Sequence, residues 1–292
     1  MKLIIIGSDG QIGFEFVEKA KKYNYEVISL THKQIEVSEE NSIIQVLDDY
    51  EFDAIINTSA YHANKAYEDK NPKKHFDVNV FGPFYLARYC EKRDKIFVHF
   101  STDYVFSGNK SRSDYFFNEN DKPIPSNLYG ASKFSGEVLI QSIPGKNIIL
   151  RISSVYGYKG CKAKGYDNFV EMIIRKYESG ETLEVVKDIF MTTTSAELVV
   201  DTTIKLVKNN NCGLFHLVGN DNCSWFDFAK EIFNLMNFSD DKLLPTESAK
   251  TKQIIDRGKN TSLSNNKIKK LGIEIDHWKF YLKQYINGRI RL

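Results

Sequence analysis

The sequence predicts an α/β fold, in which a doubly wound parallel sheet is covered by helices and a smaller C-terminal lobe follows. Short, unbroken aliphatic runs such as Leu3–Ile6 alternate with segments of helical periodicity through the first half of the chain. Strands of this composition are buried on both faces, as they are in parallel sheets. The second half is less regular, which indicates a separate lobe built from late segments.

The elements of the first half alternate between strand and helix. The strands are predicted at Leu3–Ile6, Val27–Leu30, Ala54–Asn57, Ile96–Phe100 and Ile148–Ile152. The helices between them are predicted at Phe14–Tyr23, Ser42–Asp49, Pro72–Glu91 and Tyr129–Ile140. Because a helix separates successive strands, we expect the strands to run parallel.

The second half supplies a lobe and a return to the first domain. We predict helices at Asn168–Glu178, Ala196–Lys208 and Ser224–Met236, strands at Leu183–Val186 and Gly213–Leu217, and a short helix closed by Gly272. The first domain is predicted to comprise residues 1–156 plus about 191–218. The lobe takes about 157–190 plus 219–292 and covers the C-terminal edge of the sheet, where ligands bind in open α/β folds.

Composition narrows the class of protein. The 292 residues carry a formal net charge of +2 with both signs interspersed, which argues against nucleic acid or an anionic membrane as partner. The apolar run at the N-terminus is far shorter than the ~20 residues that span a bilayer. The four cysteines form no CxxC pair and fit no metal template. We therefore expect a cytoplasmic protein with reduced thiols, and we leave homodimer formation open.

A glycine-rich loop follows the first predicted strand. Gly7, Gly10 and Gly13 have GxxGxxG spacing between that strand and the next helix. In dinucleotide-binding folds the first glycine allows a tight turn, the second a close approach to the pyrophosphate, and the third close packing of helix on strand. Phosphates then lie at a helix N-terminus, where backbone N–H groups favour anions. The loop therefore predicts a Rossmann-type nicotinamide dinucleotide site.

The choice between NADPH and NADH depends on the end of the second strand. An acidic residue that would bind the adenosine ribose is not evident about 20 residues after the loop. His32 and Lys33 stand there instead. A basic pair attracts a 2′-phosphate, so we favour NADPH and keep NADH as the alternative.

A tyrosine, a lysine and a threonine form the candidate catalytic group. Tyr129 and Lys133 are four residues apart on a predicted helix and therefore share a face. Tyrosine, with a reference pKa of about 10, becomes an effective acid when a nearby ammonium stabilises its phenolate. Thr102 follows the strand Ile96–Phe100, at the sheet edge where its hydroxyl could hold a carbonyl oxygen. We predict that these three residues are catalytic.

Several longer motifs extend this pattern over nearly the whole chain. They are GSDGQIG from Gly7, IINTSAYHA from Ile55, FSTDYVFSG from Phe100, PSNLYGASKFSGE from Pro125 and LRISSVYG from Leu150. With these motifs the sequence resembles the extended short-chain dehydrogenase/reductase superfamily and, within it, the dTDP-4-dehydrorhamnose reductase family. The resemblance implies reduction of a 4-keto-6-deoxy sugar nucleotide by hydride transfer to C4.

The resemblance also implies residue roles. Tyr129 would protonate O4, Lys133 would lower the Tyr129 pKa and hold the nicotinamide ribose, and Thr102 would orient the keto oxygen. The implied cofactor-binding residues are Gly7, Gly10, Gln11, Ile12, Gly13, Glu36, Val37, Ser59, Ala60, Tyr61, Tyr129 and Lys133. Those implied on the substrate side are His62, Asn64, Asp103, Tyr104 and Ser154.

Departures from the family pattern fall on the substrate side. Ser154 stands where a Trp is usual, which removes a side chain of the class that buries 150–250 Å². His62 and Asn64 replace residues that are commonly Thr and Val. The reaction type is therefore expected to be kept, while the identity of the sugar stays open and could be a larger or differently substituted 4-keto sugar. Some family members bridge a dimer with a metal, and Glu15 matches one such position, but we assign no metal.

Two other functions stay open. One is a non-catalytic regulatory subunit of the methionine adenosyltransferase type, against which the retention of Thr102, Tyr129 and Lys133 argues. The other is a nucleotide-sugar epimerase or dehydratase, which recycles a tightly held NAD. Dehydratases usually carry two acids beside the catalytic Thr, whereas Asp103-Tyr104 supplies one. The remaining histidines are interpreted as structural, with His99 and His216 in buried strands and His75 facing solvent.

Overall fold

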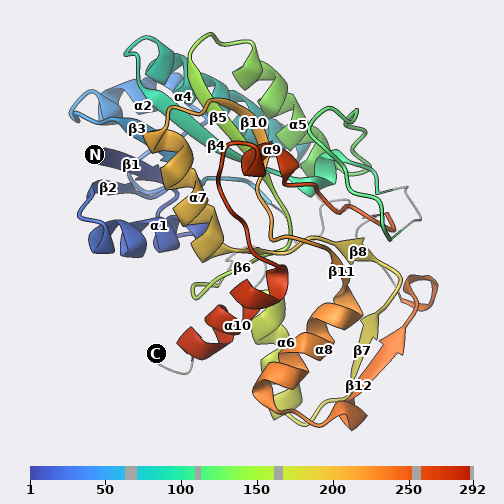
Figure 1. The fold of residues 1–292 in the computed structure, drawn as a ribbon. Coiled ribbons are helices and arrows are strands. Elements are labelled where there is room, and N and C mark those ends of the chain that lie inside the picture. The colour runs from blue at the N-terminus through green and yellow to red at the C-terminus, as the bar shows by residue number, and fades with distance from the viewer. Residues whose placement is uncertain (63–70, 109–112, 161–166, 252–257, 290–292) are drawn as a thin grey trace.

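A parallel sheet forms the centre of the molecule (Figure 1). The computed structural model describes residues 1–292 except 63–70, 109–112, 161–166, 252–257 and 290–292. Within these ranges the sheet has the order β10-β5-β4-β3-β1-β2, and every neighbouring pair is parallel. Its strands are β1 (Lys2–Ile6), β2 (Glu26–Leu30), β3 (Ala54–Asn57), β4 (Ile96–Thr102), β5 (Lys146–Ile152) and β10 (Gly213–His216). The predicted doubly wound fold is confirmed.

The strand order places the ligand edge. After β2 the chain crosses back over β1 to form β3, so the order reverses between β1 and β3. In open α/β sheets ligands bind beyond the carboxyl ends of the strands at such a switch point. In this sheet one strand, β2, lies beyond β1 on the side away from β3. The six-stranded dinucleotide-binding sheet with strand order 3-2-1-4-5-6 has two strands there.

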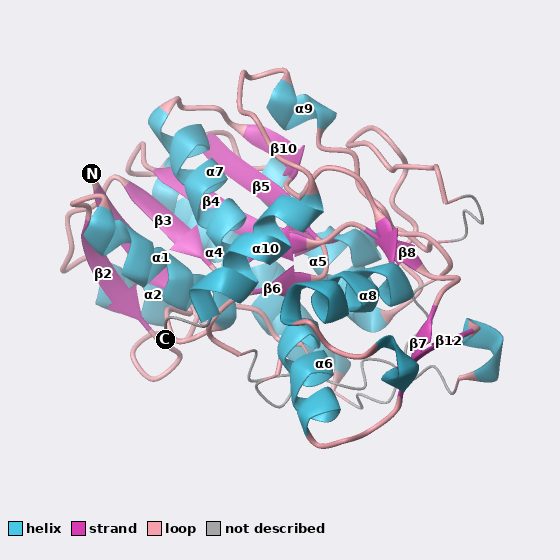
Figure 2. Ribbon diagram, turned by 60° about the horizontal axis from the view of Figure 1, so that its bottom comes forward, coloured by secondary structure: helices cyan, strands magenta, loops and turns pink. Residues whose placement is uncertain are grey.

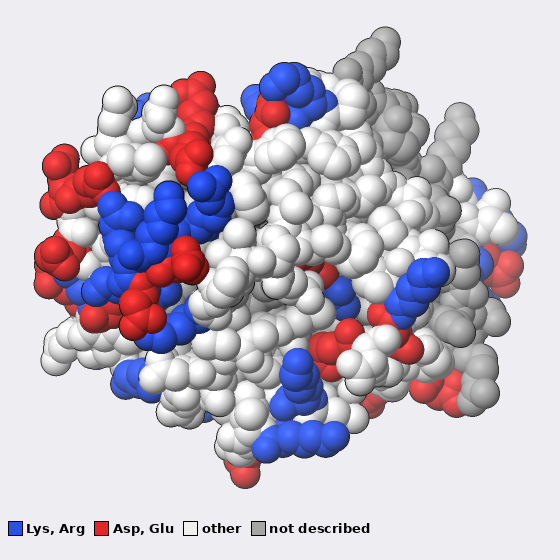
Figure 3. Space-filling model, turned by 90° about the horizontal axis from the view of Figure 1, so that it is seen from above, with Lys and Arg blue, Asp and Glu red and all other residues white. Residues whose placement is uncertain are grey.

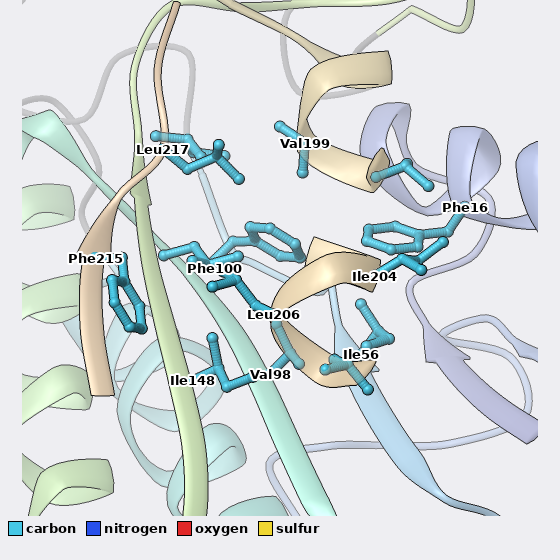
Figure 4. Packing of buried hydrophobic residues seen from close by; sticks show 14 of the residues in the cluster. Phe16, Ile56, Val98, Phe100, Ile148, Val199, Ile204, Leu206, Phe215 and Leu217 are labelled. Carbon is cyan, nitrogen blue, oxygen red and sulfur yellow. The ribbon is translucent and has the colours of Figure 1, made fainter. Parts of the chain in front are cut away.

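Helices cover both faces of the sheet (Figure 1). On one face α1 (Gln11–Lys22) packs beside α7 (Ala196–Lys208). On the other lie α2 (Glu40–Leu47), α4 (Gly82–Glu91) and α5 (Leu128–Gln141). Figure 4 shows Phe16 of α1 and Val199 and Leu206 of α7 packed against the sheet residues Val98 and Phe100. Apolar burial on both faces explains the continuous aliphatic runs of the strands.

The long helix predicted within Pro72–Glu91 is confirmed, and its middle is π-helical. The chain forms α3 (Pro72–Phe76), a π-helical turn η1 (Asp77–Phe81) and then α4. Pro83 has no N–H to donate to the carbonyl of Asn79. Gly136 of α5 packs against that carbonyl, since a Cβ on Gly136 would lie 2.3 Å from the Asn79 oxygen. The π-helical turn η1 is therefore in close contact with α5.

A second core holds the C-terminal lobe together (Figure 2). Its elements are α6 (Phe169–Glu178), β7 (Leu183–Val186), α8 (Trp225–Met236), β12 (Leu243–Thr246) and α10 (Trp278–Arg289). Ser224 caps α8, where Ser224 and Asp227 form a reciprocal capping box. Short pairs connect the lobe to the sheet: β6 (Val155–Tyr156) with β9 (Thr194–Ser195), and β8 (Phe190–Met191) with β11 (Cys223–Ser224).

One late segment belongs to the sheet rather than to the lobe core. It contains α9 (Asn266–Lys269), which contacts β10. Ile268, Ile273 and Ile275 are buried in the same cluster as Phe16 and Phe100. The predicted two-part division of the chain stays a proposal, to which this packing adds a second return of the chain from the lobe to the sheet.

Charges of both signs are mixed on the surface. On the face shown in Figure 3, Lys and Arg side chains alternate with Asp and Glu side chains, and a broad area carries neither. Among the described residues no helix combines the length and the apolar character needed to cross a bilayer.

Candidate active site

The glycine loop connects β1 to α1 at the switch point. Gly7 has a φ of +78°, which favours glycine. A Cβ on Gly13 would lie 2.3 Å from the Gly7 carbonyl oxygen, so only glycine permits this packing. The Thr58 hydroxyl, just past β3, donates hydrogen bonds to the carbonyls of Ile6 (2.8 Å) and Gly7 (3.0 Å). The loop is therefore fixed between β1 and β3.

We expect Gly13→Ala to lower stability and dinucleotide affinity together, because the added methyl displaces the loop from α1. Gly10→Ala is the matched control for stability alone, since a Cβ there meets only the Gly7 oxygen at 3.2 Å and φ is −81°. Thermal unfolding and fluorescence titration with NADPH measure the two effects. Equal Tm values for Gly13→Ala and Gly10→Ala would contradict this account of the loop.

Two buried asparagines hold the segment Ser59-Ala60-Tyr61. Asn57 Oδ1 accepts hydrogen bonds from the Ser59 N–H (3.1 Å) and hydroxyl (2.6 Å). Asn79 of η1 accepts from the Tyr61 N–H (2.8 Å) and donates to the Tyr61 carbonyl (2.9 Å). Asn79 also donates to the Ser132 hydroxyl of α5 (3.0 Å). This segment is thereby tied to the helix that carries Tyr129 and Lys133.

The N-terminus of α5 brings Tyr129 to the end of β4. The Asn127 side chain caps the helix by accepting from the Gly130 N–H at 2.8 Å. A Cβ on Gly130 would lie 2.1 Å from the Tyr104 carbonyl oxygen, so the helix sits directly on η2 (Asp103–Val105). The Tyr129 ring lies edge-on to His62, with ring centroids 4.4 Å apart, and 6.2 Å from the Tyr104 ring.

Thr102 ends β4 and lies immediately before η2. Its hydroxyl donates to Asp103 Oδ1 (3.1 Å) and accepts from the Tyr104 N–H (3.2 Å). The second oxygen of Asp103 accepts from the Thr261 hydroxyl at 2.7 Å. Asp103 is 4% exposed, so its carboxylate orients Thr102 from within the protein. Tyr104 is more open and lies beside Tyr129.

Lys133 is buried at the centre of α5. It is 1% exposed, and its Nζ lies 2.8 Å from Nε2 of His99 on β4. Burial lowers the pKa of Lys133 to about 7, although the carboxylate of Glu137 partly opposes that shift. Burial and the neighbouring Lys133 hold the pKa of His99 well below its usual value. His99 also contacts Asn57, with Nδ2 and Nδ1 3.1 Å apart.

A buried ion pair lies one helical turn beyond Lys133. Arg151 of β5 donates to both oxygens of Glu137, at 2.9 and 2.6 Å, and the two side chains are 2% and 0% exposed. His216 of β10 accepts from Arg151 and lies 3.1 Å from the Phe117 carbonyl. Burial and Arg151 lower the pKa of His216 to about 3, so it is neutral. The network fixes α5 on the sheet.

The other predicted residues lie around this edge. Gln11 and Ile12 form the first turn of α1, and Gln11 Nε2 donates to the Val155 carbonyl at 3.4 Å. Glu36 is exposed and Val37 buried beyond β2, and Ser154 follows β5 with a φ of +45°. Asn64 lies outside the described residues.

The basic pair that favours NADPH is accessible, and one histidine expectation is wrong. His32 and Lys33 are both exposed directly after β2, where they can meet a phosphate. His75 was expected to face solvent, but it is 0% exposed. Its ring lies edge-on to Tyr61, 4.8 Å between centroids, because α3 folds back over the Tyr61 segment.

Glu15, the position matched to a bridging metal, lies beside a lysine. Lys19 Nζ is 2.8 Å from Glu197 Oε1 and 2.8 Å from Asp201 Oδ2, and burial raises the pKa of Glu15. The ammonium of Lys19 thus neutralises this acidic group. Within the described ranges, no set of three or more His, Cys, Asp or Glu side chains is arranged to hold a metal ion.

Sequence reasoning missed the residues that support the predicted ones: Asn57, Asn79, His99, Glu137 and Arg151. A signal was available for two of them. Asn57 and His99 interrupt otherwise apolar buried strands and are register partners in the sheet. Buried polar groups are almost always hydrogen-bonded, so such a pair indicates a network. Glu137 repeats the four-residue spacing of Tyr129 and Lys133.

The site can now be compared with known proteins. The RmlD substrate binding domain family model matches residues 1–290. The spore coat polysaccharide biosynthesis protein SpsK of Bacillus subtilis is 30% identical over 99% of this chain and 98% of its own. The dTDP-4-dehydrorhamnose reductase of Aggregatibacter actinomycetemcomitans is 30% identical over 80% of this chain and 78% of its own.

Solved structures agree with these relatives. The crystal structure of dTDP-4-dehydrorhamnose reductase from Bacillus anthracis in complex with NADP has a TM-score of 0.89 at 27% identity, covering 98% of this chain and 99% of that one. An ortholog from Clostridium acetobutylicum has a TM-score of 0.88 at 28% identity and covers both chains fully, at 100% each. The chain therefore belongs to the dTDP-4-dehydrorhamnose reductase family, within the extended short-chain dehydrogenase/reductase superfamily.

Proposed function

We propose that this protein is an NADPH-dependent oxidoreductase that reduces the ketone of a nucleotide-linked 4-keto-6-deoxy sugar. One observation carries the proposal: α5, which bears Tyr129 and Lys133 one turn apart, packs through Gly130 on η2, the turn that directly follows Thr102 at the end of β4. This edge of the sheet also holds the glycine loop. A proton donor, a hydroxyl to orient a carbonyl, and a dinucleotide loop are the parts that a ketone reduction needs.

The loop residues fit a dinucleotide. The first turn of α1 begins at Gly10, whose lack of a side chain leaves the helix without a side-chain cap. Its N–H groups are therefore available to a pyrophosphate. The bound nicotinamide would supply the hydride. Ser59, Ala60 and Tyr61 would lie along the cofactor, Glu36 and Val37 at its adenine end, and Lys133 at the nicotinamide ribose.

The side chains of this chain handle the proton and the ketone. Tyr129 would donate its phenolic proton to O4 as hydride reaches C4. Thr102 would hold the keto oxygen after its hydroxyl turns from Asp103, and His62, Tyr104 and Ser154 would border the sugar. Because Ser154 is much smaller than the Trp that is usual at this position, we propose a substrate larger or differently substituted than that of Trp-bearing relatives. The name of the SpsK relative supports a product used for polysaccharide synthesis.

The two other functions are not favoured. The solved dehydratase and epimerase structures are 15–17% identical and show the fold alone. The complete Thr102, Tyr129 and Lys133 group argues against a regulatory subunit. Stoichiometric consumption of added NADPH separates a reductase from both, since an epimerase or dehydratase recycles its NAD and a regulatory subunit consumes nothing.

The test is a spectrophotometric screen of NADPH oxidation against 4-keto-6-deoxy sugar nucleotides that differ in base and in sugar substituents. We expect turnover with at least one of them, and weaker activity when NADH replaces NADPH. Binding of NADPH without turnover on any keto sugar would overturn the proposed reaction while leaving the dinucleotide site intact.

A further inference from the structure

The further inference concerns the proton on Lys133. The residues that surround it form a chain from the cofactor segment to α5: the Ser59 N–H, Asn57, His99 and Lys133. Each side chain in this chain is buried, with Asn57 and His99 at 0% exposure and Lys133 at 1%. The direction of each hydrogen bond follows from the first donor.

A backbone N–H can only donate, so the Asn57 atom facing Ser59 must be the carbonyl oxygen. The amide nitrogen of Asn57 therefore faces His99 and donates to Nδ1 at 3.1 Å. A neutral imidazole carries one hydrogen, so Nδ1 as acceptor places that hydrogen on Nε2. His99 is neutral because its complete burial disfavours the charged form and lowers its pKa.

Nε2–H of His99 then points at Lys133 Nζ, 2.8 Å away. An ammonium has three N–H donors and no acceptor, so two donors would face each other. A neutral amine has a lone pair and accepts this hydrogen bond. If the hydrogen bonds ran in the opposite direction, from Lys133 to His99 and from His99 to Asn57, the side-chain amide of Asn57 would have to flip. Its NH₂ group would then face the Ser59 N–H, and a buried donor would lack an acceptor.

We propose that Lys133 is a neutral amine in the cofactor-free protein, held so by the tautomer of His99, and that it takes up one proton when the dinucleotide binds. The inference rests on the proposed function for the identity of that ligand. Phosphates bring negative charge, and ribose hydroxyl oxygens accept hydrogen bonds from an ammonium, so binding favours the charged form. The proton comes from solvent, and it forms the ammonium that acidifies Tyr129.

The charged and titratable groups around Lys133 agree with this direction. His99 faces it from β4, and Tyr129 and Glu137 lie one turn to either side on α5. Glu137 is the group that favours the ammonium, but Arg151 of β5 pairs with it through both carboxylate oxygens. Burial therefore dominates, and the pKa of Lys133 falls to about 7. Below that pH the amine is protonated without any ligand.

Calorimetric titration with NADP⁺ in buffers of different ionisation enthalpy counts the protons taken up. A group with a pKa of about 7 predicts uptake of roughly 0.5–0.9 proton per NADP⁺ at pH 8 and roughly 0.1 at pH 6. The same titration of Lys133→Met measures the protons taken up or released by the 2′-phosphate of NADP⁺. The proton uptake that belongs to Lys133 should be absent in this variant. Asn57→Asp should also suppress it, because a carboxylate accepts from His99 Nδ1–H, makes Nε2 an acceptor and favours the ammonium beforehand.

A second measurement needs no ligand. Nitrogen-15 NMR distinguishes the two tautomers of a histidine, and His99→Gln assigns the His99 signals among the six histidines of the chain. We expect the hydrogen of His99 on Nε2 at pH 8, and on Nδ1 in Asn57→Asp. A hydrogen on Nδ1 in the unsubstituted protein, or NADP⁺ binding at pH 8 without proton uptake, would overturn the inference. Absence of NADP⁺ binding would instead count against the proposed cofactor.

Discussion

Replacing Tyr129 with Phe should lower kcat by about 10²–10⁴-fold, the usual contribution of a positioned general acid. The phenol hydroxyl is the group placed to protonate the developing alkoxide. The ring itself packs against His62 and Tyr104, and Phe keeps those contacts. We therefore expect the Kd for NADPH and the Tm to change little. Single-turnover NADPH oxidation with the best keto sugar measures the chemical step.

Tyr89→Phe is the matched control for loss of a tyrosine hydroxyl. Tyr89 lies on α4, and its hydroxyl donates to Asp48 at 2.8 Å, outside the site. That variant should keep the full rate while losing about 1 kcal/mol of stability, the typical worth of a hydrogen bond. If Tyr129→Phe turned over as fast as Tyr89→Phe, the catalytic assignment would be wrong.

Replacing Glu137 with Gln should have the largest effect on folding. The substitution keeps the shape but leaves the Arg151 guanidinium, 2% exposed, without its carboxylate. Removing one partner of a buried ion pair costs about 3–5 kcal/mol. Urea unfolding monitored by fluorescence measures this loss. Glu137 is also the group that raises the pKa of Lys133, so that pKa should fall further in the variant.

The double variant Glu137→Met/Arg151→Met is the control. It removes both charges and fills the site with apolar groups, so it should be more stable than Glu137→Gln alone. Equal losses in the single and double variants would show that packing, rather than an uncompensated charge, determines the stability of this part of α5.

The features that the sequence predicted are those that depend on a local pattern of residues. Aliphatic runs placed the sheet strands, glycine spacing placed the loop after β1, and a four-residue spacing placed Tyr129 and Lys133 on one face of α5. These predictions were possible because the residues that form each pattern lie close together in the sequence, within one element or one turn. The predicted strand Ile96–Phe100 was short by two residues, since Ser101 and Thr102 continue β4 to the ligand edge.

Contacts between distant segments were not predictable in the same way. The close packing of Gly136 of α5 against the Asn79 carbonyl joins segments far apart in the chain. The burial of His75 depends on where α3 lies relative to Tyr61. The charge on Lys133 depends on strand register, because only the pairing of β3 with β4 sets Asn57 beside His99. No single-segment pattern contains this information.

The late return of the chain to the sheet has a consequence for how the molecule is divided. Ile268, Ile273 and Ile275 fill space beneath α7, although more than half of the chain separates them from Phe16 and Phe100. A fragment ending before them would expose aliphatic surface on the nucleotide domain. The part of the chain that forms the sheet is thus not a self-sufficient folding unit, and synthesis must pass Ile275 before the first strands acquire their full cover.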